Sequence, residues 1–137
     1  MGANMADQEV AVPFVKGKVP VIVDIANHPA IKAIAQWGPE LKRKIEEACF
    51  ADYRDKVESI GPESLPRIRR PSEVWKHLEI RHVRIDPSVK NRVVVYVVPD
   101  WDEEEQMEWC IQGTDRLVYV GQFLQYPVDG YAKDLQD

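Results

Sequence analysis

The sequence predicts an α+β fold in which a mostly antiparallel β-meander sheet packs against one long amphipathic helix. Three observations predict it: a helical repeat of apolar residues over residues 39–59, four short strand patterns after residue 79, and a length of 137 residues. That length is typical of one domain with a single core. We expect the domain to span residues 10–125, between a flexible N-terminus (1–9) and a peripheral C-terminal tail (126–137).

The N-terminal part predicts two strands and a short helix. The strands are expected over Val10–Phe14 and Val19–Ile25, because Gly17 between them tolerates the positive φ of a tight turn. Pro29 suits the first turn of a helix, which we expect to run to Trp37. Gly38 and Pro39 then end this helix.

The clearest pattern is the helix from Pro39 to Ser59. Its apolar residues recur every three or four positions, as on one face of a helix that covers a sheet. These residues are Leu41, Ile45, Ala48, Cys49, Tyr53, Val57 and Ile60. Gly61 and Pro62 are typical of a helix end.

The C-terminal half predicts a short helical turn over Ser72–Leu78 and then the meander. The four expected strands are Ile80–Ile85, Arg92–Val98, Met107–Gln112 and Leu117–Phe123. The run Val93–Val98 is apolar on both faces of a strand, so it should lie in the middle of the sheet with the long helix on one side.

Composition narrows the function classes. The net charge of −5 argues against a general nucleic-acid binder, which needs a basic surface. No stretch predicts a leader peptide or a membrane span, so we expect a cytoplasmic protein without a membrane partner. Cys49 and Cys110 are too few for a disulfide framework or a metal knuckle and are expected to be buried thiols.

The most unusual segment is Pro99–Glu108, which holds six carboxylates in ten residues and no basic residue. It has three interpretations: a solvated turn that protects the sheet, a docking surface for a basic partner, or a divalent-cation site. The spacing lacks the glycine and the distant glutamate of a calcium loop, which disfavours a metal. Within this turn, Trp101 is expected to be partly exposed or to pin the loop.

The histidines and arginines predict no catalytic site. His28, His77 and His82 have no cysteine, serine or acid at a spacing typical of a triad or a zinc site. From Arg67 to Arg92 there are eight basic residues against three acidic ones. Two interpretations of these basic residues remain open. Either they pair with carboxylates of the same chain, or the Arg67–Arg84 patch binds a phosphate or another small ligand. The second possibility requires a pocket that joins the arginines with His77 or His82.

The acidic turn also resembles a bacterial domain family whose members carry a Trp-Asp-Glu-Glu-His-Gly-Leu hairpin. Residues 101–104 match the first four positions of this motif, whereas Glu105 replaces its histidine and Gln106 its glycine. The segments Pro71–Trp75 and Leu117–Gly121 are similar as well. The loss of the histidine argues against any catalytic or metal role inherited from the family.

The resemblance implies a function, because genes of this family often lie beside genes for polymorphic toxins. It implies an immunity protein that binds a cognate toxin and occludes its basic active-site cleft, with no catalysis, cofactor or metal. The partner-binding residues would then be the acidic turn itself. These are Asp100, Trp101, Asp102, Glu103, Glu104 and Glu105.

Overall fold

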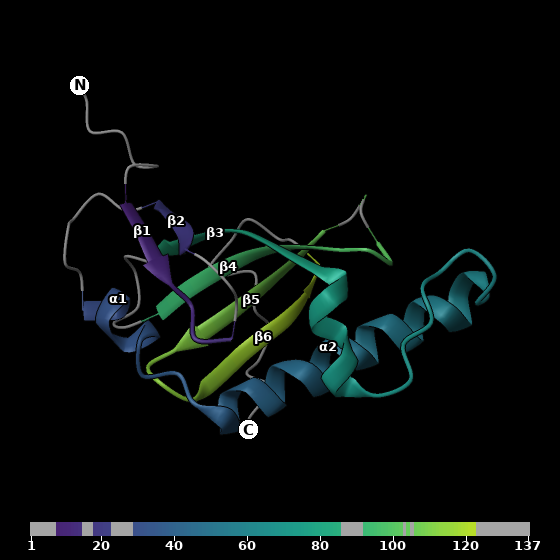
Figure 1. Ribbon diagram of the computed structural model, residues 1–137, viewed down its shortest axis with the longest axis horizontal. Coiled ribbons are helices and arrows are strands. Elements are labelled where there is room, and N and C mark those ends of the chain that lie inside the picture. Colours follow the sequence, from purple (N-terminus) through teal and green to yellow (C-terminus); the bar gives the residue numbers. More distant parts are fainter. Residues whose placement is uncertain are drawn as a thin grey trace.

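A six-stranded sheet, in the order β1-β2-β3-β4-β5-β6, forms one layer of the protein (Figure 1). The computed structural model describes residues 8–14, 18–22, 29–85, 92–102, 104 and 106–122. The strands are β1 (Gln8–Ala11), β2 (Lys18–Ile22), β3 (Leu78–Ile85), β4 (Arg92–Pro99), β5 (Met107–Gln112) and β6 (Arg116–Gln122). Neighbouring strands are antiparallel except for β2 and β3, which are parallel. The predicted α+β class and the C-terminal meander are confirmed.

The parallel pair has a simple cause in the chain order. Between β2 and β3 the chain forms α1 (Pro29–Ile34), α2 (Pro39–Ile60) and the 3₁₀ helix η2 (Pro71–His77). A connection of this kind returns the chain to the same end of the sheet, which makes the next strand parallel. α1 ends at Ile34, three residues earlier than predicted, and single turns closed by the Gln36 and Trp37 amides follow it.

α2 has 22 residues and matches the predicted helix to within one residue at its end. Pro39 lies in its first turn, where the missing N–H removes no helical hydrogen bond. Gly61 ends it at a φ of 87°, with its N–H bonded to the Val57 carbonyl. None of the described helices has the length and apolar character needed to cross a bilayer.

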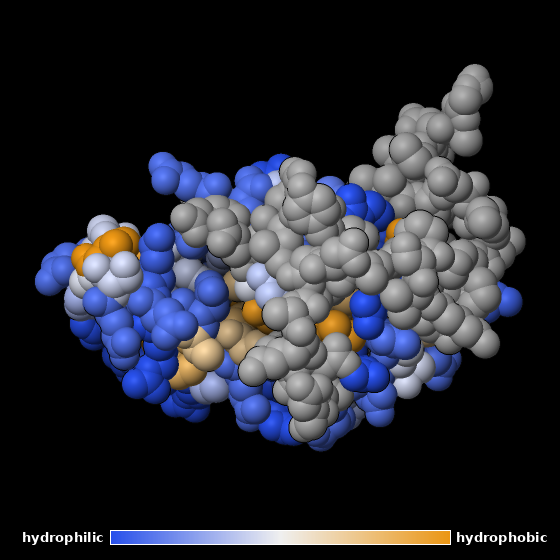
Figure 2. All heavy atoms as spheres, turned by 180° about the vertical axis from the view of Figure 1, so that it is seen from behind, coloured by the Kyte–Doolittle hydropathy of each residue, from blue (hydrophilic) through white to orange (hydrophobic). Residues whose placement is uncertain are grey.

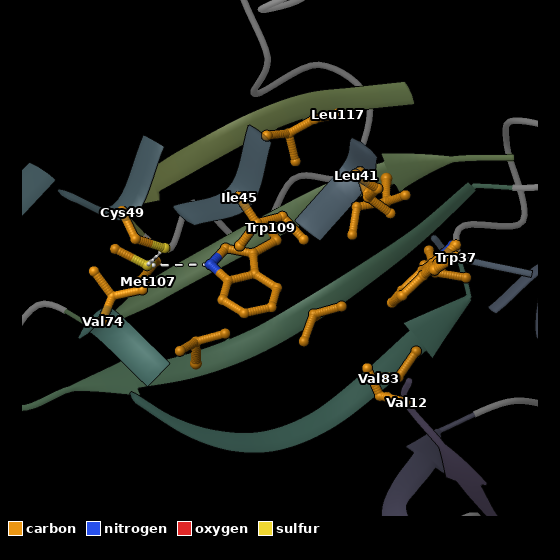
Figure 3. Close-up of a cluster of buried hydrophobic side chains, with 14 of the residues drawn as sticks. Val12, Trp37, Leu41, Ile45, Cys49, Val74, Val83, Met107, Trp109 and Leu117 are labelled. Atoms are coloured by element: carbon orange, nitrogen blue, oxygen red, sulfur yellow. Dashed lines mark hydrogen bonds between the residues drawn. The ribbon is translucent and has the colours of Figure 1, made fainter. Parts of the chain in front are cut away.

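The main core lies between α2 and the sheet (Figure 3). Leu41, Ile45 and Cys49 point from the helix toward Trp109 and Met107 of β5. The Trp109 indole N–H lies 3.2 Å from the Met107 sulfur, and the Cys49 sulfur lies 3.9 Å from it. Burial raises the pKa of the Cys49 thiol well above its usual range, so it stays protonated.

The opposite face of the sheet holds a second, smaller cluster. Figure 2 shows the molecule from behind relative to Figure 1, with apolar side chains visible near its centre. Val94, Cys110 and Val118 are buried on this face of the sheet, and the half-buried Tyr119 packs against them. β4 is therefore apolar on both faces, as its valine run predicted. Both cysteines are buried and free, which confirms the expectation for them.

Candidate functional site

The acidic segment forms the turn between β4 and β5, on the side of the molecule where the C-terminal half of α2 lies (Figure 1). Two backbone hydrogen bonds close it: the Asp102 N–H to the Pro99 carbonyl at 3.2 Å, and the Gln106 N–H to the Asp102 carbonyl at 3.1 Å. A third joins the Asp100 N–H to the His77 carbonyl of η2 at 2.8 Å. The described part of the turn is thus closed by its own backbone and tied to η2.

Trp101 is the anchor of this turn. Its side chain is only 2% exposed, and its indole N–H donates to the Asp52 carboxylate of α2 at 2.9 Å. The ring also meets the edge of Tyr53, with 5.6 Å between centroids. Of the two roles expected for Trp101, the structure shows the pin and not the partly exposed ring. Trp101 is therefore buried in the fold and joins the turn to α2.

Two aspartates of the turn pair with residues of neighbouring elements. One Asp100 carboxylate oxygen lies 3.1 Å from Nδ1 of His77, and Asp102 lies 3.6 Å from the Lys56 ammonium of α2. Asp100 keeps 54% of its side chain exposed, whereas Asp102 keeps only 18%. Asp100 is thus accessible to solvent, and Asp102 mainly ties the turn to α2.

Glu104 is exposed, while Glu103 and Glu105 lie outside the described residues. α2 adds two carboxylates that the sequence did not single out, the exposed Asp55 and the half-buried Asp52. The pKa of Asp52 is raised, first by burial and then by the charges of Asp102 and Asp55, although the Trp101 hydrogen bond opposes this shift. Asp52, Asp55 and Asp102 thus lie near one another where α2 meets the turn, together with the basic Lys56.

Gln106, at the end of the turn, has an unusual backbone conformation. It has a φ of 53°, in the left-handed region that non-glycine residues avoid. It stands where the motif has glycine, the residue that adopts this conformation without a steric cost.

Arg67 and Arg84, the two ends of the predicted phosphate patch, lie on different parts of the molecule. Arg67 lines a shallow groove with Tyr53 and loop residues between α2 and η2, whereas Arg84 lies on β3 beside Val94 of β4, on the sheet face away from α2. Arg81 pairs with Glu79 at 3.1 Å. Neither groove described along α2 contains His77 or His82.

Among the basic residues between Arg67 and Arg92, the expected pairing within the chain is seen for Arg70 with Glu73 and for Arg81 with Glu79. His77 pairs with Asp100, while His82 packs against Tyr96 with 4.8 Å between ring centroids. His28 lies outside the described residues. Within the part of the chain that is described, no three His, Cys, Asp or Glu side chains are arranged to hold a metal ion.

Comparison with known proteins places the chain in a family. The model of the family described as Domain of unknown function (DUF6985) matches residues 4–127. No curated protein and no solved structure matches the chain. The match extends from before β1 to beyond β6 and thus includes every described strand and helix. The chain belongs to the DUF6985 family.

Proposed function

We propose that this protein is an immunity-type inhibitor that binds a basic protein toxin through an acidic surface. This acidic surface comprises Asp100, Asp102 and Glu104 of the β4–β5 turn together with Asp55 of α2; Glu103 and Glu105 complete the turn in sequence. The observation that carries the proposal is the anchoring of the turn. Trp101 fixes it to α2, so that exposed carboxylates are presented on an ordered scaffold.

Anchoring favours binding because little conformational entropy is then lost when the partner docks. The carboxylates would be drawn to a cationic cleft by long-range attraction, which raises the association rate. Occupation of a toxin's active-site cleft by this surface would block substrate access. The mechanism requires no chemistry from the inhibitor, and its partner specificity would come from the arrangement of charges.

The first experiment is capture of the tagged protein from its native host, with identification of whatever co-purifies in stoichiometric amount. We expect one toxin domain whose activity is lost in the complex and restored on dissociation. Capture of the toxin with undiminished activity would refute inhibition. Recovery of the protein alone, in a host that expresses the toxin, would refute the immunity function.

The second experiment tests the surface. The double variant Asp100→Asn/Glu104→Gln should lower the association rate on the order of tenfold at low salt and flatten its salt dependence. The matched control is Glu40→Gln/Glu47→Gln, which removes two exposed carboxylates from the N-terminal half of α2 and should bind as the wild type does. Equal effects of the two double variants would show that net charge, and not this surface, determines binding.

A further inference from the structure

Two arginines lie together on the sheet face away from α2. Arg84 of β3 is the register partner of Val94 of β4, and Arg92 precedes Val94 by two residues on the same strand. Both arginines therefore share the face on which Val94 is buried with Cys110. As diagonal neighbours on adjacent strands, their Cα atoms are about 7–8 Å apart. Long guanidinium side chains at this spacing can reach one common ligand.

Each of these arginines has a buried donor without an acceptor. Nη2 of Arg84 and Nε of Arg92 are buried and make no hydrogen bond within the described part of the chain. Arg92 donates through Nη2 to Gln112 at 2.9 Å, and neither arginine is in an ion pair with a described carboxylate. Buried cationic donors without acceptors are costly, and two neighbouring positive charges repel each other. An anion between them removes both costs.

Two other ionisable groups lie on this face, His82 and the buried Glu108 of β5; Glu108 is the register partner of Tyr96, two positions along β4 from Val94, and is in no ion pair with Arg84 or Arg92 among the described residues. His82 lies two residues before Arg84 on β3, and its pKa is lowered by burial and, to a smaller extent, by the charge of Arg84. The imidazole is then neutral at pH 7 and can still donate one N–H. Arg84 and Arg92 each remain partly exposed. A β-bulge between Ile80 and His82 directs His82 to this face, and bulges often re-aim side chains beside functional sites.

We propose that Arg84 and Arg92 bind the phosphoryl group of a small phosphate monoester on the sheet face away from α2. One arginine can bind both oxygens of a carboxylate through two parallel N–H groups. The phosphoryl group of a monoester instead offers three oxygens, which can accept hydrogen bonds from two arginines. Its two negative charges balance the two guanidinium charges. The site is separate from the acidic surface and does not depend on the proposed inhibitory function.

The test uses the whole protein and three probes at matched ionic strength: methyl phosphate, sodium acetate and sodium chloride. The titration is followed by nitrogen-15 NMR of the arginine Nε–Hε groups. This signal is chosen because Arg92 Nε is one of the two buried donors that have no acceptor among the described residues. We expect a saturable shift of the Arg92 signal with methyl phosphate and none with chloride. Equal shifts with chloride would overturn the site, and a preference for acetate would overturn the phosphoryl class.

Variants locate the site. By calorimetry, Arg84→Gln and Arg92→Gln should each weaken methyl phosphate binding by about tenfold, since each removes a charge-assisted hydrogen bond. Arg69→Gln, which removes an exposed arginine of the loop before η2, is the matched control and should bind unchanged. If Arg84→Gln and Arg92→Gln both bound methyl phosphate as tightly as the wild type, the proposed site would be wrong. The wild-type NMR titration stands by itself if either variant fails to fold.

Discussion

Gln106→Gly should stabilise the protein, because Gln106 holds a φ of 53° that glycine adopts without strain. The left-handed conformation costs a non-glycine residue about 1–2 kcal/mol. Glycine gives back about 0.4–1 kcal/mol through the greater freedom of the unfolded chain. The net gain in the free energy of unfolding is then about 0.5–1 kcal/mol, or roughly 2–5 °C in melting temperature for a domain of this size.

Urea unfolding followed by far-ultraviolet circular dichroism measures this gain. The urea concentration at the midpoint of unfolding should rise, while the dependence of the unfolding free energy on urea stays the same. Gln106→Ala is the control, since it removes the same side chain but keeps a Cβ and hence the strain. We expect no gain from alanine. A gain of equal size in the alanine variant would show that the glutamine side chain, and not the backbone conformation, is the source of the strain.

Three further predictions concern the residues around Trp101 and the core. Tyr53→Phe removes a hydroxyl that donates to the Pro66 carbonyl at 2.6 Å and accepts from the buried Ile68 N–H at 3.2 Å. It should cost about 1–3 kcal/mol of unfolding free energy in urea, because a buried N–H loses its acceptor; an unchanged midpoint would contradict this. Asp52→Asn should raise the melting temperature at pH 7, because burial and the charges of Asp102 and Asp55 disfavour the ionised carboxylate and raise its pKa. Because the pKa of Asp52 is raised in the folded state, its protonated form stabilises the folded protein fully below the ordinary pKa of 3.8. This stabilisation is lost as the pH rises through the folded-state pKa. The advantage of the asparagine variant over the wild type should therefore vanish in acid. Persistence of the full advantage at low pH would rule out this electrostatic cause. Cys49 and Cys110 are buried, so a thiol reagent should label neither in the native protein and both after unfolding; rapid labelling of the native protein would show that the core opens readily.

Local patterns alone were sufficient to predict the helices and most strands. Leu41, Ile45, Cys49 and Tyr53 recur every four residues because a helix brings those positions to one face, and all four are buried. Gly61 ends the helix because it tolerates a positive φ. The valine run of β4 predicted a central strand, since only a strand covered on both faces can bury every position.

The acidic turn was predicted as a surface feature from composition alone, and the exposure of Asp100 and Glu104 agrees with that. The role of Trp101 could not be decided in this way. A tryptophan among acidic residues reads as an exposed anchor or a buried pin, and the choice depends on whether Asp52, 49 residues away in the chain, lies within reach of the indole N–H.

Periodicity and turn residues were enough to locate α2 and the four strands of the meander, because these elements depend on residues close together in the chain. The strand order, the parallel pairing of β2 with β3 and the pairing of charges become visible only in the folded protein. Arg84 and Arg92 look like ordinary basic residues in the sequence, and they become neighbours, with donors that have no acceptor among the described residues, only when β3 and β4 pair. Such contacts join residues far apart in the chain, so no local pattern encodes them.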